Sequence, residues 1–352
     1  MKRRDILTAA AAGPAVLAAP ALAQSAIEWK YPTSFPANAP GVGTNATGFA
    51  DRVNAMADGR LRLNIFSSGD LVPPFAVEDA VQQGTAEIGH STPYYNAGKN
   101  PALHFFTTAP FGLSANEQAA WLRYGGGQEL WDEIYAERDL IPLYSGNSSV
   151  QAAGWFRKEI NSVADLQGLN MRIAGLGGEA MRKLGVNAVL LPPPEIFPAF
   201  QSGAIDAAEW VGPMLDQAFG LNKVTNICYA PAFHEPSAAL EVVVNKDAWD
   251  SLTPDLQAIL RSAAEACVTE SLSQFEFFNA QAFAQLKETG VEFRAFPPEV
   301  IDALKAAVAE VMEEQAAAST QFARVKESYD AFLALAIPYA DAFTAPSLTQ
   351  RG

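Results

Sequence analysis

The segment from Gln151 to Glu235 constrains the fold of this chain most, because it contains a complete series of strand and helix signals. A short apolar strand pattern around Arg172 runs into a glycine-rich turn at 175–178, and an amphipathic helix pattern follows. A second helix is predicted after the three prolines at 192–194, and the chain then returns to an extended segment at 204–211. Strand, helix, helix and strand in this order predict an α/β domain, in which ligands bind where strands end.

The polar residues at these predicted strand ends and loops suit a small carboxylate ligand with a hard cation beside it. They comprise one cation, two carboxylates, one amide and one large aromatic residue: Arg172, Glu209, Glu235, Gln151 and Trp210. The planar fork of arginine fits a carboxylate with two hydrogen bonds. Two carboxylates that face one site are costly unless a cation neutralises them, and oxygen ligands favour Na⁺ or Ca²⁺ over zinc. Taken singly, the arginine and the glutamates also fit ordinary surface positions, and the tryptophan fits a core position.

Several stretches of this segment resemble the DctP-type solute receptors of TRAP transporters, and most of all the branch that binds 2-oxo and 2-hydroxy acids. The stretches are RIAG with the helix GGEAMRKLG, the run PPPEIFPAFQSGAIDAAEWVGP, and the glutamine that precedes GWFRKEI. The resemblance covers essentially the whole chain after its first 23 residues. It implies an α/β, two-domain periplasmic binding protein fold with a ligand cleft between the domains and long C-terminal helices.

The resemblance also implies a role for each residue that matches the family pattern. Arg172 would pair with the carboxylate of the substrate. The side chains of Gln151, Glu209 and Glu235, with the backbone carbonyl of Trp210, would hold a metal ion that the substrate also contacts. Two glutamates, a monocarboxylate and one arginine sum to −2, which Ca²⁺ cancels and Na⁺ halves. This count favours Ca²⁺, and the resemblance admits both ions.

Residues outside this segment are expected to complete the pocket. Tyr94, Tyr95 and Phe111 are predicted to form the opposite, N-terminal wall, and Asn147 is a further hydrogen-bond donor to the substrate. Glu241 is a rival to Glu235 as a ligand, but its valine neighbours indicate an alternating strand.

Residues 1–23 predict a cleaved export signal, because Lys2, Arg3 and Arg4 precede an apolar stretch that ends in a small-residue cleavage site. The paired arginines resemble a twin-arginine signal, and a Sec signal is the alternative, so a periplasmic location is expected. Loss of this segment changes the formal charge from −15 to −17. Such an acidic chain argues against nucleic acid and anionic membrane surfaces as partners.

The sequence as a whole predicts four parts. They are the signal at 1–23, an N-terminal α/β domain at 24–148, a second α/β domain at 149–245 with most ligand residues, and a helical region at 246–352. Repeated strand–helix units predict mainly parallel sheets. The helical region is expected to span both domains.

Within this C-terminal region, a helix from Pro298 to about Ala318 carries an apolar stripe. The stripe covers either its own domain or a second subunit, since some members of the resembled branch exchange a C-terminal helix in a homodimer. The two cysteines, Cys228 and Cys267, are predicted to be buried thiols rather than a disulfide.

The sequence contains no recognisable catalytic constellation. The three histidines lack metal-ligand spacing, and the glycines at 175–178 lack the ending of a phosphate-binding loop. We therefore expect a receptor and not an enzyme. This receptor would bind a small 2-oxo or 2-hydroxy monocarboxylate together with a metal ion and deliver the acid to TRAP permease subunits. Two alternatives are a receptor for C4-dicarboxylates or sugar acids, and a metal-dependent lyase that acts on 2-oxo acids.

Overall fold

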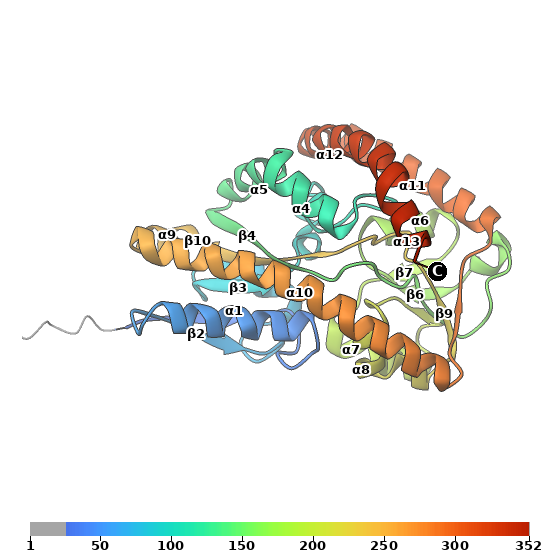
Figure 1. Cartoon of the computed structure of the whole chain (residues 1–352), viewed down its shortest axis with the longest axis horizontal. Coiled ribbons are helices and arrows are strands. Elements are labelled where there is room, and N and C mark those ends of the chain that lie inside the picture. The colour runs from blue at the N-terminus through green and yellow to red at the C-terminus, as the bar shows by residue number, and fades with distance from the viewer. Residues whose placement is uncertain (1–25, 352) are drawn as a thin grey trace, which may run out of the picture.

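The computed structural model describes residues 26–351, so the predicted signal at 1–23 lies outside the described residues. The chain forms two α/β domains that lie side by side, and the long helix α10 (Pro254–Glu288) runs across both of them (Figure 1). This helix packs on strand β4 and helix α1 at one end and on helix α8 at the other. The two-domain α/β fold predicted from the sequence is confirmed.

The N-terminal domain is built on two small sheets. Strands β1 (Ile27–Pro32) and β2 (Leu61–Phe66) are parallel, and β10 (Ala239–Asn245) lies antiparallel between β3 (Ile88–Ser91) and β4 (Leu140–Asn147). A bridge between Thr33 and His90 joins the two sheets. Their helices are α1 (Val42–Met56), α2 (Val77–Gln82), α3 (Leu103–Thr107), α4 (Ala115–Tyr124) and α5 (Gly127–Ala136).

The second domain contains a six-stranded sheet in the order β11-β9-β5-β8-β6-β7. Its strands are β5 (Gly154–Phe156), β6 (Asn170–Arg172), β7 (Asn187–Val189), β8 (Ala207–Ala208), β9 (Ile227–Tyr229) and β11 (Glu292–Arg294), and its helices are α6 (Gly175–Lys183), α7 (Pro193–Ser202) and α8 (Pro213–Phe219). The helix predicted after the proline run is confirmed, but α7 begins within that run, with Pro192 as its N-cap, and it ends before Gly203, which has the left-handed conformation.

The prediction of mainly parallel sheets is wrong, because half of the strand pairings are antiparallel. In the N-terminal domain β10 pairs antiparallel with both β3 and β4, and in the second domain β5 does so with both β8 and β9. Each of these strands directly follows a segment that joins the two domains. A strand that arrives from the opposite side of a sheet runs against its neighbours, and local strand and helix signals do not report this.

Four helices follow strand β10: α9 (Lys246–Asp250), α10, α11 (Pro298–Ala318) and α12 (Thr320–Tyr339), with the short α13 (Ala345–Thr349) at the end. The apolar stripe of α11 is buried within its own chain, where the helix packs on α6. In this single chain the stripe covers the chain's own domains. Large apolar side chains are exposed instead from α12 to α13, at Leu335, Tyr339 and Phe343.

The helical stretch at 320–349 is the one described helix that is long and apolar enough to cross a membrane, judged by length and composition alone. The two cysteines are free and buried in different apolar clusters, which confirms the prediction of two buried thiols.

Candidate functional site

The predicted ligand residues lie on neighbouring segments of the second domain. Arg172 is the last residue of β6, and Glu209 directly follows β8, which pairs with β6 in parallel. Gln151 lies between β4 and β5, and Glu235 lies between β9 and β10, on two of the segments that join the domains. Parallel strands bring their ends to one edge of the sheet, so residues far apart in sequence meet there.

Arg172 is held by Glu209 on one side only. Its Nη1 atom donates to the backbone oxygen of Glu209 at 2.7 Å and to the carboxylate Oε2 at 2.6 Å. Its Nε and Nη2 atoms are buried and have no hydrogen-bond partner. These two atoms form one edge of the guanidinium, which is the edge that binds a carboxylate through two parallel hydrogen bonds. The arginine is 1% exposed, so this free edge costs stability unless a ligand pairs with it.

Two buried carboxylates face each other beside this arginine. Carboxylate oxygens of Glu209 and Glu235 and a ring nitrogen of His234 lie within 4.8 Å of one another. Burial raises the pKa of Glu235 well above its usual value, and the negative charge of Glu209 adds to this effect. One oxygen of each carboxylate is buried without a hydrogen-bond partner. Unpaired carboxylate oxygens at this spacing match the donor set of a hard cation.

The amide of Gln151 extends this set of free oxygens. Its nitrogen donates to the hydroxyl of Ser148 at 2.7 Å, which leaves its oxygen buried and unpaired. Its backbone oxygen accepts a hydrogen bond from the backbone N–H of Ala232, which ties the segment of Gln151 to the segment that carries Glu235. With the two carboxylates, the side chains therefore offer three oxygen ligands.

Asp216 fixes the segment that carries Glu209 and Trp210. Its Oδ1 accepts from the backbone N–H groups of Val211 and Gly212, both at 3.0 Å, and its Oδ2 accepts from the indole N–H of Trp155 at 2.8 Å. Burial raises the pKa of Asp216 to about 7. The carboxylate thus orients the two peptide groups that follow Trp210, whose carbonyl is the predicted fourth ion ligand.

The N-terminal domain contributes the opposite wall through Tyr94 and Tyr95. Their rings stack with centroids 5.2 Å apart. Burial is the main cause that raises the pKa of both tyrosines, and both also respond to the charges of Glu209, Glu235 and Arg172, which lie near their hydroxyl groups. The ring of Trp210 lies against Arg172 with the guanidinium carbon 5.3 Å from its centroid.

Between these walls lies a small cavity of about 20 Å³. It is bordered by Gln151, Trp210 and the two tyrosines, and by residues that the sequence did not single out, among them Phe35 and Val42. The N-terminal domain thus closes over the ligand residues of the second domain.

Residues 175–178 do not form the predicted turn before the helix but the first turn of α6 itself, and two of these glycines are required by close contacts. A Cβ atom at Gly175 would lie 3.1 Å from the ring of Tyr94, and its φ of +64° disfavours other residues. A Cβ atom at Gly177 would lie 2.3 Å from the Cβ of His234. The first turn of α6 therefore lies close to Tyr94 and to the segment of Glu235. These close contacts explain the glycines of this motif, which has no phosphate-binding role.

The remaining sequence candidates lie at different places. Asn147 is fully buried at the end of β4, and its side-chain nitrogen has no partner. The ring of Phe111 does not border the small cavity; it packs on Phe233, and its backbone N–H donates to the oxygen of that residue at 2.7 Å. Glu241, the rival ligand, belongs to β10, where the hydroxyl of Tyr135 donates to it at 2.7 Å.

Sequence reasoning missed His234, Asp216 and Phe35. His234 adjoins Glu235, and its Nε2 lies 3.6 Å from the carboxylate of Glu209. Its place in the FHEP stretch beside a predicted ligand was the available signal. Asp216 and Phe35 act through contacts between distant segments, and nothing in their local sequence indicates this.

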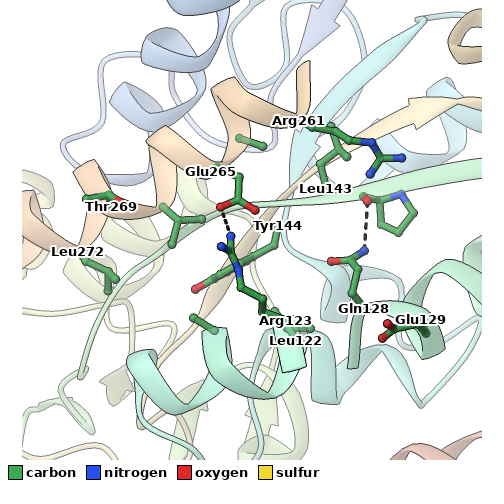
Figure 2. A pocket seen from close by; sticks show the side chains of 14 residues that line it. Leu122, Arg123, Gln128, Glu129, Leu143, Tyr144, Arg261, Glu265, Thr269 and Leu272 are labelled. Carbon is green, nitrogen blue, oxygen red and sulfur yellow. Dashed lines mark hydrogen bonds and ion pairs between the residues drawn. The ribbon is translucent and has the colours of Figure 1, made fainter. Parts of the chain in front are cut away.

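A larger cavity lies elsewhere, on the N-terminal domain between α4, α5, β4 and α10 (Figure 2). Its volume is about 530 Å³, and an ion pair between Arg123 and Glu265 crosses it. None of the predicted ligand residues borders it. We therefore place the functional site at Arg172, Glu209 and Glu235, whose unpaired buried groups lie beside the smaller cavity.

Comparisons with known proteins agree with the resemblance seen in the sequence. The model of the DctP family, described as bacterial extracellular solute-binding protein, family 7, matches residues 34–319. A monocarboxylate 2-oxoacid-binding periplasmic protein of Nostoc sp. is 41% identical over 342 residues, which cover 94% of each chain.

Two solved structures share the fold over nearly the whole chain, each with a TM-score of 0.89. A TRAP transporter solute-binding protein from Bordetella bronchiseptica is 35% identical over 93% of this chain and 99% of its own. It is a mixed-occupancy dimer with copurified calcium and picolinate in one active site. A TRAP periplasmic solute-binding protein from Pseudoalteromonas atlantica, with sodium and pyruvate bound, is 36% identical over 92% and 99%.

Proposed function

This chain belongs to the bacterial extracellular solute-binding proteins of family 7, and from this premise we propose that it is the solute receptor of a TRAP transporter that binds a small 2-oxo or 2-hydroxy monocarboxylate together with Ca²⁺ or Na⁺. Members of this family bind solutes for transport and are not enzymes. The Nostoc relative is named for 2-oxo acids, and the Pseudoalteromonas relative holds pyruvate with sodium. The receptor would deliver its ligand to the membrane permease subunits of the transporter.

The observation that carries this proposal is the unpaired edge of Arg172. Its Nε and Nη2 atoms are buried and free, while Nη1 is engaged by Glu209. A carboxylate that enters the cleft would gain two charge-assisted hydrogen bonds without displacing an existing partner. The hydroxyl of Tyr95 faces the same guanidinium and would meet the ligand from the other domain.

The cation is supported by the unpaired oxygens of Gln151, Glu209 and Glu235. These three side chains would hold the ion, with the carbonyl of Trp210 as a fourth protein ligand. When bound, the ion would neutralise the acid pair and polarise the oxygen at C2 of the substrate. Sodium and calcium both occur in relatives, and the charge count favours Ca²⁺.

The test is to identify the ligand that the protein retains. Mass spectrometry of the native protein from cells grown on mixed carbon sources should release a 2-oxo or 2-hydroxy monocarboxylate, together with one calcium or sodium ion per chain. Arg172→Ala, produced in parallel, should release none. A dicarboxylate, a sugar acid or no acid from the native protein would contradict the proposal.

We infer that the protein works in the periplasm and that residues 1–23 are its export signal. Its family is extracytoplasmic, and the order of Arg3 and Arg4 matches a twin-arginine signal. Replacing both arginines with lysine in the full chain should abolish export through the twin-arginine pathway. Unchanged processing of this variant would assign the signal to the Sec pathway.

We further propose that a second copy of the chain covers the exposed apolar face from α12 to α13. Leu335, Tyr339 and Phe343 on this face are 72%, 63% and 65% exposed, and contiguous apolar surface of this kind is typical of an interface. The Bordetella relative is a dimer.

Light scattering on the mature protein should give a mass of about 70 kDa, twice that of one chain. Leu335→Glu combined with Phe343→Glu should halve this mass. Tyr124→Glu is the control, because Tyr124 is 85% exposed on α4. A mass of about 35 kDa for the unaltered protein at micromolar concentration would refute the dimer.

A further inference from the structure

The cavity beside the proposed site has an apolar wall that contains no charged group. Its apolar lining comes mainly from Phe35, Val42, Val211, Ala238 and Leu240. The remaining lining residues are uncharged as well. A volume of about 20 Å³ is room for one group the size of a water molecule or a methyl group.

Phe35 cannot leave this wall without breaking several contacts. It is 3% exposed, and its ring centroid lies 6.1 Å from that of Tyr95, 6.3 Å from that of Trp210 and 5.6 Å from that of His90. Its backbone is held as well, since its N–H donates to the hydroxyl of Thr33 at 3.1 Å. A side chain packed on several faces transmits a change in volume to its neighbours, so the wall has a fixed position.

The polar groups determine which part of a ligand meets this wall. On the proposed function, the carboxylate pairs with Arg172 and the oxygen at C2 contacts the ion held by Glu209 and Glu235. Trp210 and Tyr95 border this cavity and also lie beside the guanidinium of Arg172, so the rest of the acid would extend from the arginine into the cavity. The wall consequently contacts the side chain of the acid.

We propose that Phe35 and Val42 set the substrate specificity of the receptor, and that they select a 2-oxo acid with a short aliphatic side chain and no second charge. This inference rests on the proposed function. Longer or branched side chains exceed the cavity and displace Phe35. A second carboxylate would be buried against Phe35 and Leu240 without a cation partner, which is strongly unfavourable.

The first test measures the affinity of the unaltered protein for a series of acids by titration calorimetry in the presence of Ca²⁺. The series is pyruvate, 2-oxobutanoate, 2-oxopentanoate, oxaloacetate and picolinate. We expect 2-oxopentanoate and picolinate to bind at least tenfold more weakly than pyruvate, since one methylene in a hydrophobic pocket changes affinity about 10- to 200-fold. We expect oxaloacetate to bind at least 100-fold more weakly. Binding of oxaloacetate or 2-oxopentanoate within threefold of pyruvate would overturn the inference.

The second test asks whether the wall itself causes the selectivity. Phe35→Ala should reduce the preference for pyruvate over 2-oxopentanoate at least tenfold, and Val42→Ala should reduce it about threefold. Phe49→Leu is the control, because Phe49 is fully buried in the same domain but does not border the cavity. Its ratio of affinities should equal that of the unaltered protein.

Thermal unfolding of each variant, with and without pyruvate, shows that the variant is folded and binds. If Phe35→Ala is too unstable to measure, Phe35→Leu and Val42→Ala provide the ratio instead. An unchanged ratio in the folded variants would overturn this inference and leave the proposed function intact. Failure of the unaltered protein to bind any 2-oxo acid would overturn both.

Discussion

The substitution Arg172→Lys tests the carboxylate site most sharply, because it keeps the positive charge and removes the fork. In the structure Nη1 is already engaged by the backbone oxygen and carboxylate of Glu209, and the Nε and Nη2 edge remains for the ligand. A lysine offers a single nitrogen, which cannot hold Glu209 and both carboxylate oxygens at once. One oxygen of the buried carboxylate would lose its partner, at a cost of about 2–4 kcal/mol.

A loss of this size corresponds to a Kd for pyruvate that is about 30- to 1000-fold weaker, which titration calorimetry resolves. Arg157→Lys is the control: Arg157 lies in the same domain and donates to the backbone oxygen of Phe200, but it is exposed and does not border the site. The control should bind pyruvate within threefold of the unaltered protein. An Arg172→Lys protein that is folded and also binds within threefold would refute the assignment of this arginine.

Three further predictions follow from the same contacts. Asp216→Asn should weaken Ca²⁺ binding about tenfold in calorimetry, because an amide cannot accept hydrogen bonds from both backbone N–H groups and from the indole of Trp155 at once. Unchanged affinity for Ca²⁺ would mean that the segment of Trp210 does not need the hydrogen bonds of Asp216. Burial raises the pKa of Glu241 to about 8 in the folded protein, whereas its pKa in the unfolded chain is near 4.5. The contribution of the protonated carboxyl to stability is therefore fully present below pH 4.5 and is lost as the pH rises through 8. The melting temperature should therefore fall between pH 5 and pH 9, and Glu241→Gln should remove most of this slope; a slope that persists in the variant would assign the titration to other groups. Incubation of the purified protein with pyruvate or lactate and Ca²⁺ should leave the acid unchanged by NMR, and sustained conversion would favour the lyase alternative.

Local sequence signals were sufficient for several of the helices and for the residues at strand ends. The proline run and Gly203 delimit α7, and the apolar spacing from Pro298 to about Ala318 matches α11, because caps and periodicity act within a few residues. Sheet direction was not predictable in the same way. Strands β5 and β10 join their sheets antiparallel because each follows a segment that joins the domains, and this depends on contacts with distant segments.

The site shows the same division between local and distant signals. Arg172, Glu209, Glu235 and Gln151 were identified from their contexts in the sequence, and the structure brings their side chains together. Phe35 was not identified, because it follows the first strand and reaches the cavity only through the closure of one domain on the other.

The apolar stripe of α11 illustrates the limit of periodicity. The spacing of apolar residues along a helix is the same whether the helix packs inside its own chain or against a second subunit. Here Leu304 and Val308 pack inside the chain, and only the tertiary contacts of the helix reveal this.

The central claim is that the acid and the cation bind together at one site, and the affinity for pyruvate with and without Ca²⁺ tests it most directly. Protein stripped of metal by chelation should bind pyruvate at least tenfold more weakly than the same protein after Ca²⁺ is restored, because the ligand completes the coordination of the ion. Glu235→Gln should lose most of this difference, and Glu117→Gln, a change on the surface helix α4, should keep it. Equal affinity for pyruvate in the stripped and restored proteins would contradict the account.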